Sequence, residues 1–436
     1  MPENYIAYPS ANINGVISVP GDKSISHRSL ILLSISRGIG NITGLLESDD
    51  CLATLRIFNL LGIDIFKNSN NSYTVVGNGL HGLNETNTDL NCGNSGTSMR
   101  LLCGLLSAQK FSSLLIGDES LNKRPMERIA VPLSQMGANI ELKNNIAAPI
   151  KIKPVEKILG IDYKMPIDSA QVKSSILLAG LYADSKTNIF ENINTRNHTE
   201  NLINFLGGKI DNNKNIVTLY PNQELLAKNI DIPGDISSAM FIIVGCLISK
   251  NSEVTIKNVG LNKFRIGGIE ILKLMGGNIK VTNVKNYGPE KVGDIIVCSS
   301  NLKGIEVPSC HVASAIDEFP ILFIAAAAAS GKTILKNAQE LRHKESDRLL
   351  AMSVGLKKCN ISNVLYDDGI EINGGKISGS IVDSYGDHRV AMSFAIAGLI
   401  SKNPITILDA KNVSTSFPGF FDLMKEMGLN IDRSNS

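Results

Sequence analysis

Basic, hydroxyl and acidic side chains recur at the start of apolar stretches in this chain, and their types suit the binding of anions. Lys23, Ser24 and Arg28 open one such stretch, and the motif NSGTSMR, from Asn94 to Arg100, opens another. Lysine and arginine match phosphate and carboxylate oxygens, and a helix start adds free backbone N–H groups and a partial positive charge. Further polar residues of this kind are Ser169, Gln171, Lys173, Arg196, Arg342, Lys344, Arg348, His388 and Arg389. Together they predict a site for small polyanions.

Each polar residue also has a simpler interpretation. Serine and aspartate are ordinary N-caps, and for any single position that interpretation is favoured. An N-cap does not need a cation beside it, however, so the set as a whole favours anion binding.

Two acidic residues could move protons within such a cationic site. Asp317 precedes an apolar, alanine-rich stretch, and Glu345 lies between Lys344 and Arg348. A structural interpretation makes Asp317 a helix cap and Glu345 the partner of Arg348 in an i,i+3 ion pair. Alternatively, two carboxylates in different surroundings divide the roles of acid and base. Spacing alone leaves both possibilities open.

The elements that must position these residues form an internal repeat. Six polar openings are each followed by an apolar stretch of helical length, at intervals of about 70 residues. They begin at Asp22, Asn94, Asp168, Gly234, Ile316 and Gly386. After each stretch, an amphipathic segment ends in a glycine turn and a short strand, as in MGANI and MGGNI. We therefore expect apolar helices inside, with sheets and amphipathic helices outside.

The repeats fall into two sets of three. The strings VPGDKS at Val19 and IPGDIS at Ile232 are near copies about half a chain apart, and Pro-Gly suits a crossing between domains. We expect one domain at residues 21–235 and another formed by residues 1–20 together with 236–436.

Composition favours a cytoplasmic globular protein. Hydrophobic residues make up 43% and charged residues 19% of the 436 residues, and the net charge of +2 gives no general attraction to nucleic acid or membranes. The first residues, MPENYIAYPS, do not resemble a secretory signal, and seven scattered cysteines suit free thiols in a reducing compartment.

Two other motifs are weak. ASGKT at 329–333 lacks the first glycine of a phosphate loop and follows a helical pattern. The six histidines show no metal-binding spacing, so we expect no metal and no cofactor.

Seven longer strings resemble one enzyme family over nearly the whole chain. They are VPGDKSISHRSLIL, NCGNSGTSMRLL, GDESLNKRPM, DSAQVKSSILLAGL, DEFPILFIAAA, ELRHKESDRL and SYGDHRVAMSFAIAGL. In this order they are similar to the 5-enolpyruvylshikimate-3-phosphate synthase family. The resemblance implies a two-lobed inside-out α/β barrel with six βαβαββ repeats, three in each lobe.

The resemblance also implies a reaction and a set of site residues. The enolpyruvyl group of phosphoenolpyruvate would pass to the 5-hydroxyl of shikimate 3-phosphate, releasing phosphate through a non-covalent tetrahedral intermediate in the shikimate pathway. Asp317 would be the base, Glu345 the proton donor, and Lys23 would assist. By motif, the shikimate 3-phosphate site comprises Lys23, Ser24, Arg28, Ser169, Ala170, Gln171, Arg196, Asp317 and Lys344. The phosphoenolpyruvate site, where the herbicide glyphosate would compete, comprises Lys23, Asn94, Gly96, Arg124, Gln171, Arg348 and Arg389.

The chain departs from many members of this family at three places. Ala170 stands within SAQ where many have SSQ, and Arg196 stands in a region that is otherwise tyrosine-containing, both as in a second class of the family. Thr415 replaces a lysine of some members, which weakens any role for the C-terminal segment in binding phosphoenolpyruvate.

Two rival families share parts of this pattern. UDP-N-acetylglucosamine enolpyruvyl transferases carry a reactive cysteine near the position of GDESLNKRP, and residues 117–125 contain none. RNA terminal phosphate cyclases use a histidine nucleophile and a nucleotide, which would leave Asp317 and Glu345 without a role. We therefore expect small-molecule substrates, no nucleic acid or membrane partner, and a monomer.

Overall fold

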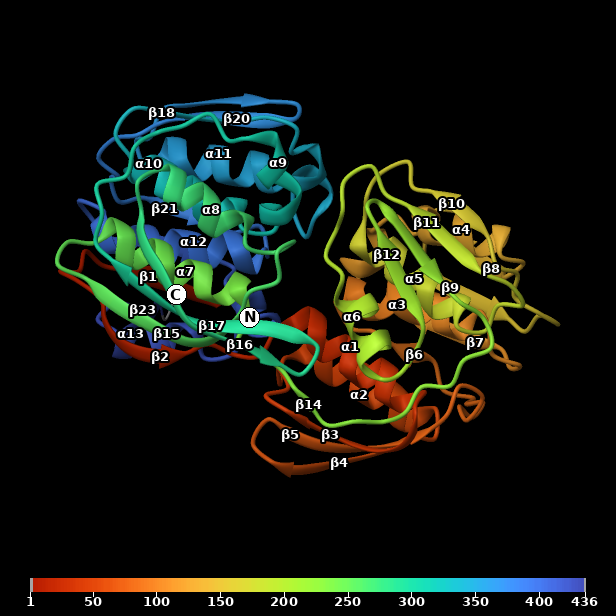
Figure 1. Ribbon diagram of the computed structural model, residues 1–436. Coiled ribbons are helices and arrows are strands. Elements are labelled where there is room, and N and C mark those ends of the chain that lie inside the picture. Colours follow the sequence, from red (N-terminus) through yellow and green to blue (C-terminus); the bar gives the residue numbers. More distant parts are fainter. Residues whose placement is uncertain (1–2, 435–436) are drawn as a thin grey trace. The chain divides into compact units, whose positions relative to one another are not determined.

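The computed structural model describes residues 3–434, and the chain divides into two compact units (Figure 1). Unit 1 comprises Met1–Pro20, Pro233–Lys285 and Lys291–Ser436; unit 2 comprises Gly21–Ile232 and Asn286–Glu290. The boundary therefore lies at 232/233 rather than at 235/236. The short segment 286–290 also belongs to unit 2, which the repeat pattern did not indicate.

Unit 2 contains three four-stranded sheets that share one pattern. In each sheet an edge strand pairs in parallel with its neighbour, and the other pairings are antiparallel. In spatial order the sheets are β14 (Ile230–Asp231), β3 (Arg37–Thr43), β5 (Ser72–Asn78) and β4 (Asp64–Ser69); β6 (Leu90–Asn91), β7 (Ser113–Ile116), β9 (Ala147–Lys153) and β8 (Asn139–Lys143); and β10 (Asp162–Lys164), β11 (Thr187–Phe190), β13 (Ile216–Leu219) and β12 (Ile210–Asn213).

Unit 1 repeats the pattern with one reduced sheet. Its sheets are β21 (Ile381–Asp383), β22 (Ile405–Leu408), β1 (Asn4–Ala7) and β23 (Ile431–Ser434); β16 (Asn278–Tyr287), β17 (Glu290–Cys298), β15 (Glu253–Gly260) and β2 (Asn14–Ser18); and β18 (Lys332–Leu335), β20 (Gly369–Asn373) and β19 (Asn363–Tyr366). In the last sheet, the parallel edge strand is replaced by isolated bridges from Lys303 to Ser330 and from Glu306 to Ile334.

The six apolar stretches are the inner helices. In unit 2 they are α1 (Lys23–Ser34), α3 (Gly96–Leu106) and α5 (Ala170–Gly180); in unit 1 they are α7 (Ile236–Ile248), α10 (Phe319–Ala328) and α12 (His388–Ala397). Nearly every residue of these helices is buried, including polar residues such as His27, Arg28 and Lys173. Gly104 shows how closely they pack, because a Cβ there would lie 2.0 Å from the Ser175 carbonyl oxygen. The inside-out arrangement is confirmed.

The amphipathic segments form the outer helices. They are α2 (Asp49–Leu60), α4 (Glu127–Gln135), α6 (His198–Phe205), α8 (Gly267–Leu274), α11 (Arg348–Lys358) and α13 (Phe420–Glu426). Shorter turns are α9 (Ser309–Val312), η1 (Leu121–Lys123), η2 (Ala313–Ala315), η3 (Gln339–His343), η4 (Gly398–Ile400) and η5 (Lys411–Thr415).

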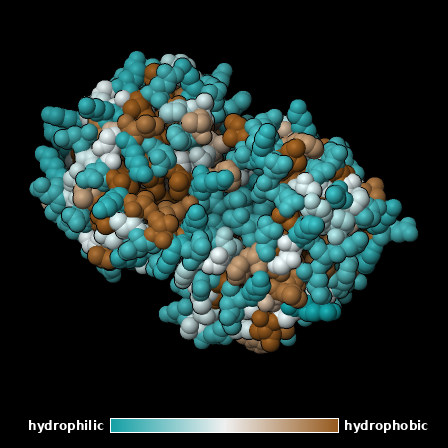
Figure 2. Space-filling view, in the orientation of Figure 1, coloured by the Kyte–Doolittle hydropathy of each residue, from teal (hydrophilic) through white to brown (hydrophobic). Residues whose placement is uncertain are grey.

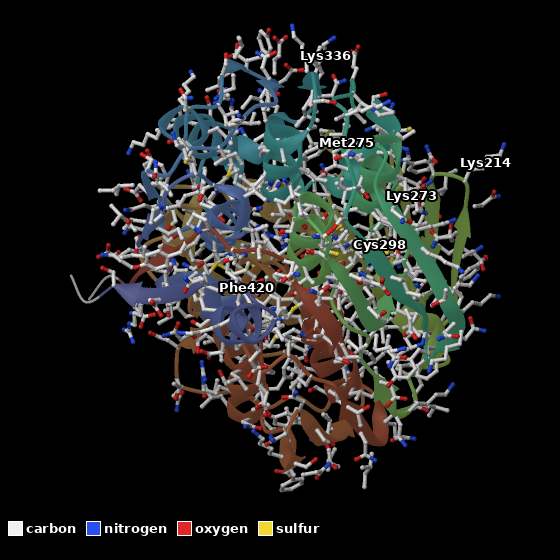
Figure 3. The ribbon with its side chains drawn as sticks, turned by 90° about the vertical axis from the view of Figure 1, so that its left-hand side faces the viewer. Lys214, Lys273, Met275, Cys298, Lys336 and Phe420 are labelled. Atoms are coloured by element: carbon white, nitrogen blue, oxygen red, sulfur yellow. The ribbon has the colours of Figure 1, made fainter. Side chains whose placement is uncertain are left out.

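The face of the molecule in Figure 2 is mostly hydrophilic, with hydrophobic residues gathered in patches. Charged side chains such as Lys336 extend beyond the ribbon, whereas Phe420 of α13 is buried (Figure 3). Within residues 3–434, no helix combines the length and the apolar character that a membrane crossing requires.

Candidate active site

In unit 2, the N-termini of α1, α3 and α5 lie together. Asp22, Ser95 and Ser169 cap these helices, each accepting a backbone N–H through its side chain. Arg100 of α3 donates to Gln171 of α5 over 2.6 Å, and Gln171 donates back to Thr97 of α3 over 3.0 Å. Asp22, Ser95 and Ser169 are therefore N-caps, as expected for serine and aspartate at a helix start. Lysine and arginine side chains lie close to these caps.

Ser24, Arg28 and Arg196 belong to one hydrogen-bonded group in unit 2. The Arg196 guanidinium donates to Ser24 Oγ over 2.9 Å. Arg28 is 2% exposed and donates from Nε to Thr199 Oγ1 and from Nη2 to Ser174 Oγ, each over 2.7 Å. Arg28 therefore joins α1 to α5 and α6, and Arg196 provides the more accessible charge.

Lys23, the first residue of α1, forms an ion pair with Asp50 of α2. The Lys23 side chain is 21% exposed, so its ammonium is held in place and can still meet a ligand. Asp50 was missed by the sequence analysis because its position, after Ser48, is that of an ordinary acidic residue in the first turn of a helix.

Asn94, Gly96 and Arg124 meet at the start of α3. Arg124 Nη2 donates to Asn94 Oδ1 over 2.8 Å, and Asn94 Nδ2 donates to Asp118 over 2.7 Å. A Cβ on Gly96 would lie 3.1 Å from Arg100 Nη1 and 3.2 Å from Arg124 Nη1. Two guanidinium groups therefore stand directly over the bare backbone of this helix start, a geometry that suits an oxyanion.

A buried chain of hydroxyls and a histidine lies behind these helix starts. His27 Nδ1 lies 2.8 Å from Thr54 Oγ1, which lies 2.6 Å from Ser98 Oγ, and Ser98 Oγ donates to Ser95 Oγ over 2.8 Å. Burial, reinforced by Lys23 and Arg28, holds the pKa of His27 well below its ordinary value. The imidazole is therefore neutral at neutral pH and links α1, α2 and α3.

This buried histidine makes stability depend on pH. Below about pH 6.5 the unfolded chain protonates His27 and the folded protein does not, so the free energy of unfolding decreases as the pH falls toward the lowered pKa. The slope is at most ~1.4 kcal/mol per pH unit. We expect His27→Gln to flatten this dependence in urea titrations between pH 7.5 and 5.5. The exposed His81→Gln is the control, and equal slopes in wild type and His27→Gln would contradict the prediction.

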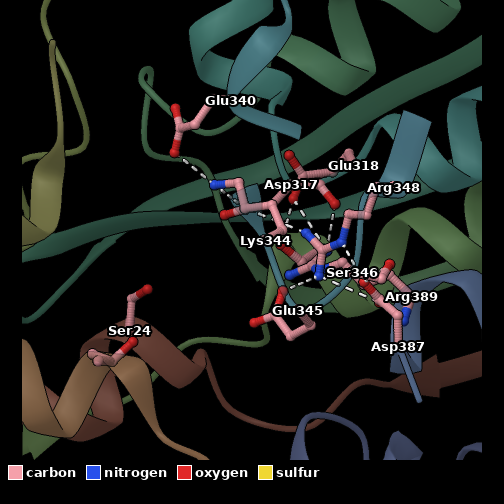
Figure 4. Close-up of polar contacts among 12 residues, drawn as sticks. Ser24, Asp317, Glu318, Glu340, Lys344, Glu345, Ser346, Arg348, Asp387 and Arg389 are labelled. Carbon is pink, nitrogen blue, oxygen red and sulfur yellow. Dashed lines mark hydrogen bonds and ion pairs between the residues drawn. The ribbon is translucent and has the colours of Figure 1, made fainter. Parts of the chain in front are cut away.

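In unit 1, three cations surround Asp317, and Figure 4 labels two of them, Lys344 and Arg348. Arg265 Nη1 donates to Asp317 Oδ2 over 3.1 Å, while Lys344 Nζ and Arg348 Nη1 lie 3.3 Å and 3.9 Å from Oδ1. Arg389 donates to the Asp317 carbonyl oxygen over 2.8 Å. Asp317 is not the cap of α10, because Glu318 occupies the N-cap position and makes no side-chain capping bond. The capping interpretation of Asp317 is therefore wrong.

Glu345 accepts from Arg348 Nη2 over 2.6 Å, so the expected i,i+3 ion pair is present (Figure 4). Arg348 is 2% exposed at its side chain and also donates from Nε to the buried Asp387 over 2.8 Å. Burial alone would lower the pKa of Arg348, but Asp387 and Glu345 outweigh it and raise that pKa. Burial alone would likewise raise the pKa of Asp387, and the Arg348 guanidinium reverses this. Arg348 is thus a fixed cation, and the Glu345 side chain, 28% exposed, is the accessible carboxylate.

The structure brings the predicted residues together in two groups. Unit 2 holds Lys23, Ser24, Arg28, Asn94, Gly96, Arg124, Ser169, Ala170, Gln171 and Arg196, and unit 1 holds Asp317, Lys344, Glu345, Arg348 and Arg389. Ala170 is the first residue of α5 and is buried. Thr415 Oγ1 donates to the Asn412 carbonyl oxygen within η5.

Arg265 and Glu318 are polar residues of unit 1 that the sequence analysis missed. Both are buried and both bond to Ser237 near the start of α7. Arg265 precedes an amphipathic helix, where a surface arginine is common, so its position alone gave no signal. Within residues 3–434, no group of three or more His, Cys, Asp or Glu side chains could hold a metal ion.

The chain matches known proteins in both sequence and structure. Residues 7–424 match the family model of EPSP synthase (3-phosphoshikimate 1-carboxyvinyltransferase). A 3-phosphoshikimate 1-carboxyvinyltransferase of Ruthia magnifica is 48% identical over 99% of both chains, and one of Legionella pneumophila (strain Corby) is 49% identical over 98% of this chain and 99% of the other. A solved EPSP synthase from Acinetobacter baumannii is 45% identical, with a TM-score of 0.90 over 99% of this chain and 100% of that chain.

The two units, with helix starts among cations in one and two carboxylates beside one guanidinium in the other, belong to an enolpyruvyl transferase. The chain belongs to the EPSP synthase (3-phosphoshikimate 1-carboxyvinyltransferase) family. It transfers the enolpyruvyl group of phosphoenolpyruvate to shikimate 3-phosphate in the shikimate pathway.

Proposed function

We propose that the residues described above carry this reaction in the roles that the sequence assigns to them. Shikimate 3-phosphate is held by Lys23, Ser24, Arg28, Ser169, Ala170, Gln171, Arg196, Asp317 and Lys344. Phosphoenolpyruvate is held by Lys23, Asn94, Gly96, Arg124, Gln171, Arg348 and Arg389. Both substrates are polyanions, which accounts for the number of cations among these residues.

The chemistry requires two opposite proton transfers. The 5-hydroxyl of shikimate 3-phosphate gives its proton to Asp317, and its oxygen bonds to C2 of phosphoenolpyruvate while C3 takes a proton from Glu345. The resulting tetrahedral intermediate then loses phosphate and a methyl proton, which restores the vinyl group on the product. The enzyme forms no covalent bond with either substrate.

One observation carries this assignment. Asp317 and Glu345 lie beside the same guanidinium, that of Arg348, but in different surroundings. Asp317 is also held by Arg265 and Lys344 and is 14% exposed at its side chain, while Glu345 is more accessible. Carboxylates in unlike environments are the arrangement by which proteins separate a base from an acid.

A phosphate-release assay tests the proposed acceptor. Purified enzyme with phosphoenolpyruvate should release phosphate when shikimate 3-phosphate is added, with the product linked through its 5-oxygen in NMR spectra. Release with UDP-N-acetylglucosamine, or phosphate formed from ATP alone, would contradict the proposal.

Gly96 provides a prediction for the phosphoenolpyruvate side. In Gly96→Ala the new methyl group would lie 3.1–3.2 Å from two guanidinium ends, so both must move by a few tenths of an ångström. Such overpacking costs roughly 1–3 kcal/mol, and 1.4 kcal/mol is tenfold in affinity. We expect the inhibition constant of glyphosate, the longer molecule, to rise ~10-fold or more, with a smaller rise in KM for phosphoenolpyruvate. Gly375→Ala, where the nearest atom is 3.6 Å away, is the control, and equal losses of both ligands would refute this steric account.

We also propose that the enzyme works as a monomer in the cytoplasm. The seven cysteines are free, and Cys310 is exposed, which suits a reducing compartment. Sedimentation at micromolar concentration would reveal a dimer if the monomer proposal is wrong.

A further inference from the structure

Lys173 lies in a buried ion cluster beside the proposed substrate-binding residues of unit 2. Its ammonium is 3.0 Å from Glu191 Oε2 and 2.7 Å from Glu200 Oε1, and all three side chains are 1% exposed. Lys173 is on α5, Glu191 directly follows β11, and Glu200 is in the first turn of α6. One lysine therefore joins three separate elements of unit 2.

A buried ion cluster of this kind needs an explanation other than stability. Removing charges from water costs several kcal/mol for each ion, and well-packed apolar residues often stabilise a core equally well or better. What the cluster provides is a fixed geometry, because each carboxylate must remain beside the single ammonium.

The geometry that it fixes is that of the loop between β11 and α6. Glu191 Oε1 accepts from the Thr195 backbone N–H over 3.0 Å and from Thr195 Oγ1 over 2.6 Å. Lys173 Nζ also donates to the Thr195 carbonyl oxygen over 3.3 Å. Thr195 is therefore held on both sides of its backbone, immediately before Arg196.

A second anchor holds the start of the same loop. The Asp168 carboxylate accepts from the backbone N–H groups of Asn192 and Ile193, each over 2.8 Å. Asp168 directly precedes Ser169, the cap of α5. The loop is thus tied to α5 at two points before Arg196, and the Arg196 guanidinium, just after the second of them, reaches Ser24 Oγ.

We propose that Lys173, through Glu191 and Thr195, is a positioning residue that sets the place of the Arg196 guanidinium for shikimate 3-phosphate. This inference rests on the proposed role of Arg196. Substitutions in the cluster are expected to raise KM for shikimate 3-phosphate and to leave KM for phosphoenolpyruvate nearly unchanged. They should have little effect on either KM when Arg196 is replaced by alanine.

Thr195→Val is the mildest test, because it removes one hydrogen bond to Glu191 and keeps the side-chain shape. The matched control is Thr187→Val in β11 of the same unit, whose buried hydroxyl has no hydrogen-bond partner. We expect Thr195→Val to raise KM for shikimate 3-phosphate by about 2- to 10-fold, the worth of one hydrogen bond. The control should change it by less than twofold, and kcat should stay within twofold in both.

Lys173→Met is the stronger variant and should raise the same KM at least 10-fold. Lys173→Met leaves two buried carboxylates without their cation, so its folding is checked by circular dichroism. If Lys173→Met does not fold, Thr195→Val alone tests the proposal.

Each variant is also made in an Arg196→Ala background. If the cluster acts through Arg196, its effect on KM falls below twofold there, because residues in one network are not additive. An undiminished effect in that background would overturn the inference, as would an unchanged KM in Thr195→Val. If Arg196→Ala itself leaves KM for shikimate 3-phosphate unchanged, the proposed role of Arg196 fails first, so the two failures are distinguishable.

Discussion

Asp317→Asn is expected to lower kcat by ~10²- to 10⁴-fold, which is the range for loss of a general base. The amide keeps the size of the carboxylate, and its single oxygen can still accept from either Arg265 or Lys344, which lie 3.1 Å and 3.3 Å from Asp317 Oδ2 and Oδ1. It cannot take the proton of the substrate hydroxyl. The expected loss is therefore in the chemical step, with substrate binding weakened only by the change in charge.

Stopped-flow measurement of phosphate release separates these effects, and calorimetry reports the affinity for shikimate 3-phosphate. Asp432→Asn, which removes a surface ion pair with Lys425 in the same unit, is the control for a simple change of charge. If Asp317→Asn kept kcat within a few-fold of wild type, Asp317 would be a structural partner of Arg265 and Lys344 and another group would be the base.

The arrangement of inner helices could be predicted because it depends on a repeated local signal. A helix-length apolar stretch is expected to lie in the core of a globular domain. The structure accordingly buries nearly every residue of α7 and α10. The reduced sheet of unit 1 could not be predicted in the same way. Whether residues 303–306 form a strand or only two bridges depends on pairing with Ser330 and Ile334, which are distant in sequence.

Within the candidate site, the sequence identified residue types better than it identified their partners. Lys173 stood beside Ser169 and Gln171 and was therefore grouped with the anion-binding cations, but its position on α5 turns it toward Glu191 and Glu200. A helix turns by 100° at each residue, so neighbours in sequence face different elements. Conversely, residues that are far apart in sequence can be partners in the fold. Asp50 pairs with Lys23, and Arg265 pairs with Asp317.

Glu345→Gln is expected to lower kcat by ~10²- to 10⁴-fold for the opposite reason, namely loss of the proton donor to C3 of phosphoenolpyruvate. Glu345 is paired with Arg348 at 2.6 Å. A bound phosphoenolpyruvate beside Arg348 and Arg389 adds negative charge, and a like charge nearby favours the protonated form of a carboxyl group. The substrate itself would thus prepare Glu345 to act as an acid, which glutamine cannot do.

The ion-pair interpretation of Glu345 makes a different prediction, and Glu270 distinguishes the two. Glu270 forms an i,i+3 pair with Lys273 in the same unit, at 3.2 Å, so Glu270→Gln removes an equivalent interaction away from the proposed chemistry. An exposed pair such as Glu270–Lys273 contributes only about 0.3–0.5 kcal/mol to stability, and in Glu345→Gln the buried Arg348 keeps its pair with Asp387, so neither variant should unfold. If Glu345 is the acid, Glu345→Gln alone loses turnover, and Glu345→Asp recovers part of it. If both glutamine variants instead kept wild-type kcat, Glu345 would be no more than a helix ion pair, and the proton would have to come from Lys23 or from water.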